Sequence, residues 1–169
     1  GELAGETPEQ RYESYLERLR DPAVVLAIFR EYPVLARCLS ICVDQRVAYG
    51  LELFRHLLAD WEAIRASCCP ASDPGRLSSL EIGAGDLHRE GRSVVLLGFS
   101  SGFRLVYKPK AVAVDVHFQE LVAWLNARGL TPALRTLTVI DRGRYGWIEH
   151  VTPATCASED EVRRFYRRQ

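Results

Sequence analysis

The chain has 169 residues and carries 22 basic and 22 acidic side chains, so its formal net charge is zero. A zero net charge argues against a general nucleic-acid binder, because such proteins usually carry a basic surplus. No apolar run approaches the roughly 20 residues that a membrane span needs, and no basic-then-apolar signal opens the chain. The sequence therefore predicts a cytoplasmic protein without a membrane span.

The first third of the chain has the pattern of helices. Pro8 to Arg20 places apolar residues at helical spacing, and Asp21-Pro22 is an N-cap followed by a first-turn proline. From Val34 to about Ala66 one long amphipathic helix is predicted. Its apolar stripe consists of Leu35, Leu39, Cys42, Val43, Val47, Leu51, Phe54, Leu58, Trp61 and Ile64. Such a stripe can bind a partner, but burial within its own domain is the commoner use and the one expected here.

A loop from Cys68 to Arg76 is the best internal boundary, and after it the apolar period changes to that of strands. The predicted strands span Leu77–Gly83, Val94–Phe99, Phe103–Lys108, Leu134–Asp141 and Tyr145–Val151. Between the third and fourth lies a predicted helix, Val112–Arg128, with the apolar stripe Val114, Phe118, Leu121, Val122 and Leu125. A capping box, Ser158 and Glu161, opens a last helix.

This order predicts an α+β fold: N-terminal helices, then about five antiparallel strands plus a helix, as in the small lobe of a kinase-like fold. We place a helical region at 1–70, the kinase-like lobe at 77–151, and at 158–169 the start of a helix leading to an absent large lobe. The chain has no Met and begins at Gly1, so we expect it to be part of a longer protein. Fold class alone does not define a function.

Cysteine usage gives no sign of a metal site or of disulfide bonds. The five cysteines are odd in number and form no CxxC pair. Cys38 and Cys42 lie one helical turn apart, a spacing that two metal ligands could use, but two small core residues on one helix face are the simpler interpretation. His56, His117 and His150 show no metal-ligand spacing. We therefore predict no metal in this chain and reduced thiols.

Lys108 is the first candidate for chemistry. Lys108 and Lys110 are the only lysines in an arginine-rich chain, so a lysine at the end of an apolar strand requires a reason. Alternation places Lys108 on the same strand face as Val106 and Arg104. In kinase-type folds such a lysine neutralises nucleotide phosphates, and the residue two before it packs on adenine. The alternative is a strand-end lysine that extends into solvent.

Glycines between the first two strands make a second candidate. The stretch Gly83–Gly91 lies where a kinase has its flap over the phosphates, and glycine lets a backbone approach an anion closely. It is neither a kinase GxGxxG motif nor a Walker A loop. Asp86 and His88 fall on one side of an extended loop, where they could act as an acid–base pair near a phosphate. An ordinary polar turn is the alternative.

Two further sets of residues complete the candidate site. A kinase lysine is usually braced by a carboxylate of the next helix, and here Glu120 and Asp115 are the candidates, with solvated helix charges as the alternative. The strand Trp147–Val151 takes the place of the kinase hinge, whose backbone groups bind adenine. Glu149 and Val151 are therefore candidate nucleotide contacts.

At this point the residues resemble a known family, the class II (LanM-type) lanthionine synthetases. The stretch from Gly85 to Asn126 is similar to their dehydratase domain. It carries the pattern GD-x-H-x-x-G-R-x-V at Gly85–Val94, followed by V-Y-K-P at Val106–Pro109. The resemblance extends over most of the chain from about Tyr32. Where the family often has Arg after YKP, this chain has Lys110.

The resemblance implies an enzyme that uses ATP and Mg²⁺ to phosphorylate Ser and Thr of a leader-bearing precursor peptide. Elimination of phosphate then gives dehydroalanine and dehydrobutyrine. A separate cyclase domain, absent here, carries Zn²⁺. Carried over, Lys108 resembles the nucleotide-phosphate lysine, while Asp86 and His88 resemble active-site loop residues. The metal ligands would lie in the rest of the synthetase chain, so residues 1–169 alone are expected to lack dehydratase activity.

Two alternatives remain from the sequence. One is a non-catalytic peptide-binding module, in which a strand edge takes up an extended peptide. The other is an unrelated kinase-like phosphotransferase, which the GD-x-H loop in place of a glycine-rich flap disfavours. Convergence of Lys108, Asp86 and His88 on one cleft would separate the enzyme from the binding module.

Overall fold

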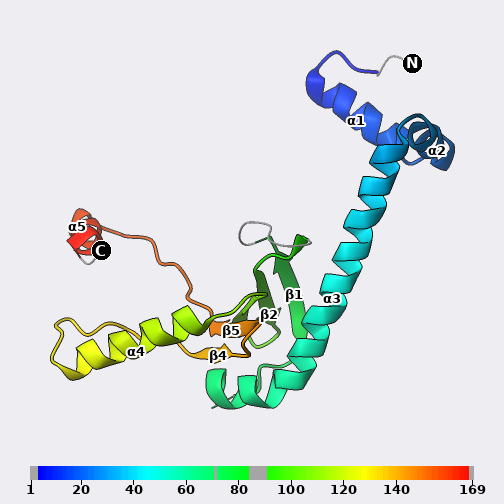
Figure 1. Cartoon of the computed structure of the whole chain (residues 1–169). Coiled ribbons are helices and arrows are strands. Elements are labelled where there is room, and N and C mark those ends of the chain that lie inside the picture. Colours follow the sequence, from blue (N-terminus) through cyan, green and yellow to red (C-terminus); the bar gives the residue numbers. More distant parts are fainter. Residues whose placement is uncertain (1–3, 71, 84–90, 168–169) are drawn as a thin grey trace. The chain divides into compact units, whose positions relative to one another are not determined.

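The computed structural model describes residues 4–70, 72–83 and 91–167 and contains two compact units, Gly1–Phe54 and Arg55–Gln169 (Figure 1). Asp86 and His88 lie outside the described residues. The domain bounds predicted at 1–70, 77–151 and 158–169 stay predictions. In the described part of the chain, no helix is both long enough and apolar enough to cross a bilayer.

The first unit consists of α1 (Pro8–Arg18), α2 (Pro22–Glu31) and the beginning of α3 (Pro33–Cys68). Local capping explains where the first two helices start. The Thr7 hydroxyl accepts from the Gln10 N–H at 3.3 Å, and the Gln10 side chain accepts from the Thr7 N–H. Asp21 accepts from the N–H of Ala23 at 2.9 Å, ahead of the predicted first-turn proline. These bonds satisfy N–H groups that have no partner inside a helix.

The expectation that the α3 stripe is buried is wrong for most of its length. Leu35, Leu39, Val43, Val47, Leu51, Phe54 and Leu58 are all exposed, and the thiols of Cys38 and Cys42 are exposed rather than in a core. The reason lies at the end of the helix, where Leu57, Asp60 and Ile64 are the buried residues. That buried face is rotated away from most of the stripe, so Ile64 is the only stripe residue that is fully buried, while Trp61 is partly buried.

The second unit is built on a five-stranded antiparallel sheet, ordered β1-β2-β3-β5-β4. The strands are β1 (Leu77–Ile82), β2 (Val95–Phe99), β3 (Arg104–Lys108), β4 (Val139–Asp141) and β5 (Gly146–Glu149). The α+β prediction, with about five antiparallel strands and a helix, is therefore confirmed.

β4 is shorter than the predicted strand Leu134–Asp141. The N–H of Leu134 donates to the Asn126 side chain at 2.9 Å, and the N–H of Leu137 donates to the Gln119 side chain at 2.8 Å. Backbone groups that bond to helix side chains cannot also join a strand ladder, so pairing begins only at Val139.

One face of the sheet forms the core of this unit. Strand alternation and pairing place Val95, Leu97, Leu105, Tyr107 and Trp147 on this face, and all five are fully buried. The last turns of α3, from Arg55, pack on the same face, with Trp61 stacked on Phe99 at 5.6 Å between ring centroids. The opposite face carries Leu96, Val106 and Ile148, which pair side by side across three strands.

Two helices follow the first three strands: α4 (Ala113–Ala127) before β4 and α5 (Glu159–Arg167) at the end. The predicted apolar stripe of α4 is wrong for Val114, Phe118 and Leu121, which are exposed, while Val122 is buried. Asp115, Gln119 and Asn126 instead form hydrogen bonds to groups of the second unit. These polar bonds select the inward face of α4. The predicted Ser158 cap of α5 is present, with its hydroxyl 3.4 Å from the Glu161 N–H.

A buried carboxylate joins α3 to the sheet. Asp60 accepts from Arg142 Nε at 2.7 Å, from the Tyr145 hydroxyl at 2.9 Å and from Trp147 Nε1 at 2.8 Å. Burial by itself would raise the pKa of Asp60, but the bonds from Trp147, Arg142 and Tyr145 outweigh it and hold the pKa below 3.8. The carboxylate therefore stays ionised and fully bonded in the folded protein.

His56, one turn before Asp60, extends the same cluster. Its Nδ1 lies 2.8 Å from the Tyr107 hydroxyl, and its ring stacks on Tyr145 at 3.6 Å between centroids. Burial, followed by the hydrogen bond to Asp60, raises the pKa of Tyr145 to about 12. Tyr145 is therefore a neutral donor at every physiological pH. His56 and Asp60 together fasten one helix to β3, β5 and the turn that leads into β5.

We predict that Asp60→Asn destabilises the chain by about 3 kcal/mol at pH 7, because it removes the buried charge to which Arg142, Tyr145 and Trp147 all donate. A carboxyl whose pKa is lowered on folding stabilises above its unfolded pKa and loses that contribution as the pH falls through the folded value. The difference between wild type and Asp60→Asn should therefore shrink as the pH drops below 3.8. Urea unfolding at pH 7 and at acidic pH measures it. Asp160→Asn on exposed α5 is the control, and an undiminished difference at low pH would contradict the prediction.

Candidate functional site

The candidate site lies at the end of β3, on the sheet face opposite the core. Leu105 and Tyr107 are buried on the core side, so Val106 and Lys108 point to the other side. The register places Val106 between Leu96 of β2 and Ile148 of β5. The sequence prediction that Lys108 and Val106 share a strand face agrees with this arrangement. Three apolar side chains thus lie side by side across the sheet, two positions along β3 from Lys108.

Lys108 forms an ion pair with Asp115 in the first turns of α4. Nζ lies 2.8 Å from Asp115 Oδ1, with 25% of the lysine side chain and 32% of the aspartate side chain exposed. Of the two carboxylates considered from the sequence, Asp115 is the one that reaches Lys108. Glu120 instead bonds to Nδ1 of His117 at 2.9 Å on the exposed side of the helix. Because both side chains are only partly exposed, water weakens their attraction only in part, and the Lys108 ammonium remains accessible.

The loop that holds Asp86 and His88 is anchored at the same end of the sheet as Lys108. Ile82 at the end of β1 pairs with Val95, and Val95 pairs in turn with Tyr107, the neighbour of Lys108. The buried hydroxyl of Ser93 accepts from the Gly83 N–H at 3.0 Å and ties the two ends of the loop together. The positions of Asp86 and His88 themselves lie outside the described residues.

The proposed hinge residues differ in their surroundings. The Glu149 carboxylate pairs with Arg135 and accepts from the Thr138 N–H at 3.2 Å, while the Glu149 N–H donates to the Thr138 carbonyl at 3.0 Å. Val151 follows the end of β5 and is exposed. The Glu149 N–H is therefore already bonded within the sheet, and it is not a free donor.

Sequence reasoning missed the Asp60 cluster, which supports β3 from the other side of the sheet. Tyr107, next to Lys108, bonds to His56 on the core side. The available signal was the spacing of His56 and Asp60, two polar residues four apart on one helix face. Without knowledge of which strands lie over that face, the spacing does not identify the partners.

Comparison with known proteins assigns the family. A family model described as a domain of unknown function, DUF4135, matches residues 32–169. The chain belongs to this family. It is also similar to the lacticin 481/lactococcin biosynthesis protein LcnDR2 of Lactococcus lactis subsp. lactis, with 22% identity over 175 residues. That alignment covers 98% of this chain and 18% of the relative, so the chain spans less than a fifth of the relative's length. Together the two matches confirm the resemblance to the class II lanthionine synthetases.

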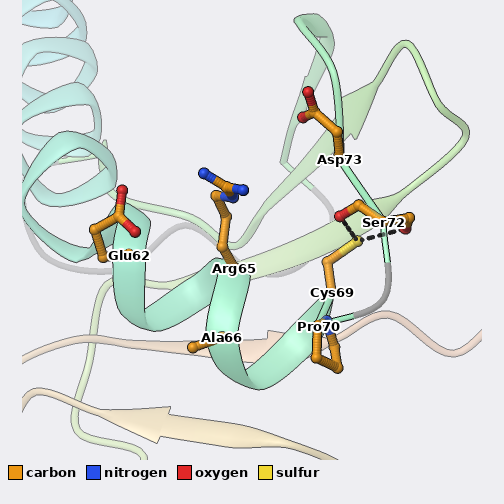
Figure 2. Close-up of a pocket in the computed structure, with 7 residues that line it drawn as sticks. All are labelled: Glu62, Arg65, Ala66, Cys69, Pro70, Ser72 and Asp73. Atoms are coloured by element: carbon orange, nitrogen blue, oxygen red, sulfur yellow. Dashed lines mark hydrogen bonds between the residues drawn. The ribbon is translucent and has the colours of Figure 1, made fainter.

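A separate pocket of this DUF4135 chain lies at the C-terminal end of α3 (Figure 2). Its lining residues are Glu62, Arg65, Ala66, Cys69, Pro70, Ser72 and Asp73. The Cys69 thiol is bonded to Ser72, 3.1 Å from its hydroxyl. None of the residues predicted for the site lines this pocket.

The Cys68 thiol, next to this pocket, is not a reactive group. Burial, followed by the charge of Glu149 and the neighbouring Cys69, raises the pKa of Cys68 to about 11. Cys68 is therefore a protonated, unreactive thiol at neutral pH. Among the described residues, no group of three or more His, Cys, Asp or Glu side chains is arranged to hold a metal.

Gly146 sets how closely the start of α4 approaches Lys108. It lies directly opposite Lys108 in the β3–β5 register. A Cβ at this position would collide with Val112 and would lie 2.8 Å from the Ile140 carbonyl oxygen. Val112, the residue before α4, is fully buried. The missing side chain therefore lets the start of α4 pack on the sheet beside the lysine.

We predict that Gly146→Ala destabilises the chain by about 1–3 kcal/mol, because the added methyl group overpacks a rigid site. Gly50→Ala is the matched control: apart from the adjacent residues and the backbone of its own helix, no atom lies within 4 Å of a Cβ there, and in a helix Ala should stabilise by up to about 1 kcal/mol. Urea denaturation of both variants measures the change. Equal stabilities of Gly146→Ala and wild type would show that Val112 moves aside without cost.

Proposed function

We propose that this chain is the nucleotide-binding start of a lanthipeptide dehydratase. Within the full synthetase, it would help to phosphorylate Ser and Thr of a precursor peptide with ATP. Elimination of that phosphate would then leave dehydroalanine or dehydrobutyrine. The observation that carries the proposal is the Lys108–Asp115 pair at the end of an apolar sheet face. Its support from the comparisons is the DUF4135 match and the relative named for lacticin 481 biosynthesis.

Lys108 is proposed to neutralise nucleotide phosphates. Its side chain is three-quarters covered, so it interacts with an anion through less water than a fully exposed lysine would. Asp115 fixes the direction of the ammonium, as the carboxylate brace does in kinase-type sites. Phosphate oxygens can share the ammonium with Asp115, since Lys has three donors.

The apolar strip beside Lys108 is proposed as the seat of the adenine ring. Leu96 and Val106 lie side by side on this face and are half-buried, with the buried Ile148 of β5 next to Val106. A purine ring gains from apolar contact on its flat face. Contacts at Glu149 and Val151 would be made by backbone groups other than the Glu149 N–H, which donates to Thr138.

Acid–base work is proposed for Asp86 and His88. Their loop starts and ends at the sheet end that carries Lys108, and this supports a position near the phosphates. Elimination requires a base that takes the proton from Cα of the phosphorylated residue, while the Cβ–O bond breaks and phosphate leaves. A histidine oriented by an aspartate suits such proton transfer near neutral pH.

The described residues do not themselves form a magnesium site. A bound Mg²⁺ prefers carboxylate and phosphate oxygens, and no carboxylate cluster of that kind is present among the described residues. Magnesium ligands are therefore proposed to come from the rest of the synthetase, and a zinc site only from its cyclase domain.

We predict that Lys108→Ala in the full synthetase lowers precursor phosphorylation and dehydration together, by roughly 100-fold or more, since a group that stabilises transferring charge is lost. Lys110→Ala is the matched control, because Lys110 is exposed and is the only other lysine of the chain. Mass spectrometry of the precursor peptide distinguishes a phosphate adduct of about +80 Da from a loss of about 18 Da. Full activity of Lys108→Ala would refute the proposal, and binding without any mass change in the wild type would favour the peptide-binding alternative.

The brace can be tested by a second pair of variants. Asp115→Asn should raise the KM for ATP and slow phosphorylation by roughly tenfold or more, because the lysine loses its orienting charge. Glu120→Gln on the exposed side of α4 should leave both values within about twofold, since Glu120 bonds only to His117 among the described residues. The reverse ranking of the two variants would assign the brace to Glu120.

A further inference from the structure

We propose that Gln119 and Asn126 are positioning residues for the Lys108 site, because their amide side chains set the orientation of α4 and thereby the place of Asp115. The proposal rests on the function proposed above, since it assigns residues that act on the phosphate lysine without touching the nucleotide. Both side chains are half-buried, and both bond to backbone groups of the segment that precedes β4.

The two amides make different demands on their chemistry. Asn126 pairs with both backbone groups of one residue: its Nδ2 donates to the Leu134 carbonyl at 2.7 Å, and its Oδ1 accepts from the Leu134 N–H at 2.9 Å. Gln119 uses its oxygen, and Oε1 accepts from the Leu137 N–H at 2.8 Å. The first contact therefore requires a donor and an acceptor, whereas the second requires only an acceptor.

The spacing of the two contacts fits a segment that runs back along the helix. The chain turns after α4 and returns toward β4 (Figure 1). Three steps of extended chain, from Leu134 to Leu137, cover at most roughly 10 Å. The seven steps from Asn126 back to Gln119 cover about 10.5 Å of helix. The two lengths match, so the segment lies antiparallel to α4 with one amide contact at each end.

The same segment is attached to the sheet on its other side. The Thr138 N–H donates to the Glu149 carboxylate at 3.2 Å, and the Thr138 carbonyl accepts from the Glu149 N–H at 3.0 Å. Glu149 also pairs with Arg135 of the segment. Through this segment the two amides connect α4 to β5, the strand that pairs with β3 and its Lys108.

Apolar burial does not account for this orientation of α4. At about 100° per residue, the exposed apolar stripe is centred roughly 110° around the helix axis from the face that carries Asp115 and the two amides. The stripe consists of Val114, Phe118 and Leu121. Burial of apolar surface alone would favour an orientation that covers this stripe. The amides oppose it, and they keep the Asp115 carboxylate, one turn before Gln119, at 2.8 Å from Lys108 Nζ.

Substitutions that separate the two chemical demands test the proposal in the full synthetase. Gln119→Met removes the acceptor at nearly constant length, so it should raise the KM for ATP roughly fivefold and leave the KM for the precursor peptide within about twofold. Gln119→Glu keeps an acceptor and should retain the wild-type KM for ATP. Asn126→Asp loses its donor and brings a carboxylate to the Leu134 carbonyl, so it should resemble Gln119→Met. Glu120→Met, at the exposed neighbouring position, is the matched control.

A double-mutant cycle separates positioning from a general effect on folding. In an Asp115→Asn background, Gln119→Met should change the KM for ATP by less than about twofold, because the group that it positions has lost its charge. The same factor in both backgrounds would overturn the proposal. So would a Gln119→Glu variant as impaired as Gln119→Met. Circular dichroism and the thermal midpoint check the folding of each variant, and if Asn126→Asp does not fold, the two Gln119 variants decide alone.

Lys108→Ala, measured alongside, keeps this inference apart from the proposed function. Full activity of Lys108→Ala would end the nucleotide role of the site and, with it, the positioning role of the amides. An inactive Lys108→Ala together with wild-type kinetics of Gln119→Met and Asn126→Asp would leave the site in place and overturn the positioning role alone.

Discussion

The Asp60 carboxylate is the contact on which the second unit depends. Its three donors are Arg142 and Tyr145, which lie in the turn between β4 and β5, and Trp147 of β5, while Asp60 belongs to α3. Since an ionised carboxylate is costly to bury alone, the helix can pack on the sheet only when these donors are in place. The hydroxyl of Tyr107 is fixed in the same cluster through His56. Strand β3 is therefore held from the core side at the residue next to Lys108.

This support has a direct effect on the opposite face. A strand exposes alternate side chains on its two faces, so fixing Tyr107 on one face also fixes the direction of Lys108 on the other. The ammonium then needs only one further restraint, which Asp115 supplies from α4. The absence of a side chain at Gly146 brings the beginning of α4 close enough for this contact. The His56–Tyr107 bond, the Asp115 carboxylate and the missing side chain at Gly146 thus together fix the position of the Lys108 ammonium.

The elements of the fold could be predicted from local patterns, because caps, turns and apolar periodicity are local. The Asp21-Pro22 start of α2, the alternation around Lys108 and the Ser158 cap belong to this class. Features decided by tertiary contacts could not. The apolar stripe of α4 suggested an inward face, yet the bonds of Gln119 and Asn126 to the segment before β4 turn that stripe outward. Likewise, the end of α3 is held by Asp60, a polar residue that periodicity does not count.

For the site, the sequence named Lys108 and both candidate carboxylates but could not choose between Asp115 and Glu120. The two carboxylates lie about 140° apart around α4, so the one that reaches Lys108 depends on which face of the helix packs on the sheet, and tertiary contacts decide that. The family resemblance rests on long, specific motifs and is confirmed by the comparisons, whereas the predicted burial of the apolar stripes of α3 and α4 was largely wrong. The Asp60 cluster joins residues more than 80 positions apart, as in the Trp147–Asp60 bond, and a single sequence contains no information on such a pairing.

The way α4 is attached has a consequence for its mobility. Three side chains on one face of α4, Asp115, Gln119 and Asn126, bind defined atoms, whereas Val122 is its only fully buried apolar residue. Apolar surfaces tolerate sliding, but hydrogen bonds are lost within a fraction of an ångström. A rotation of α4 by one residue would therefore break all three anchors at once, including the one to Lys108. The helix can be either fully seated or released, and intermediate positions have little to stabilise them.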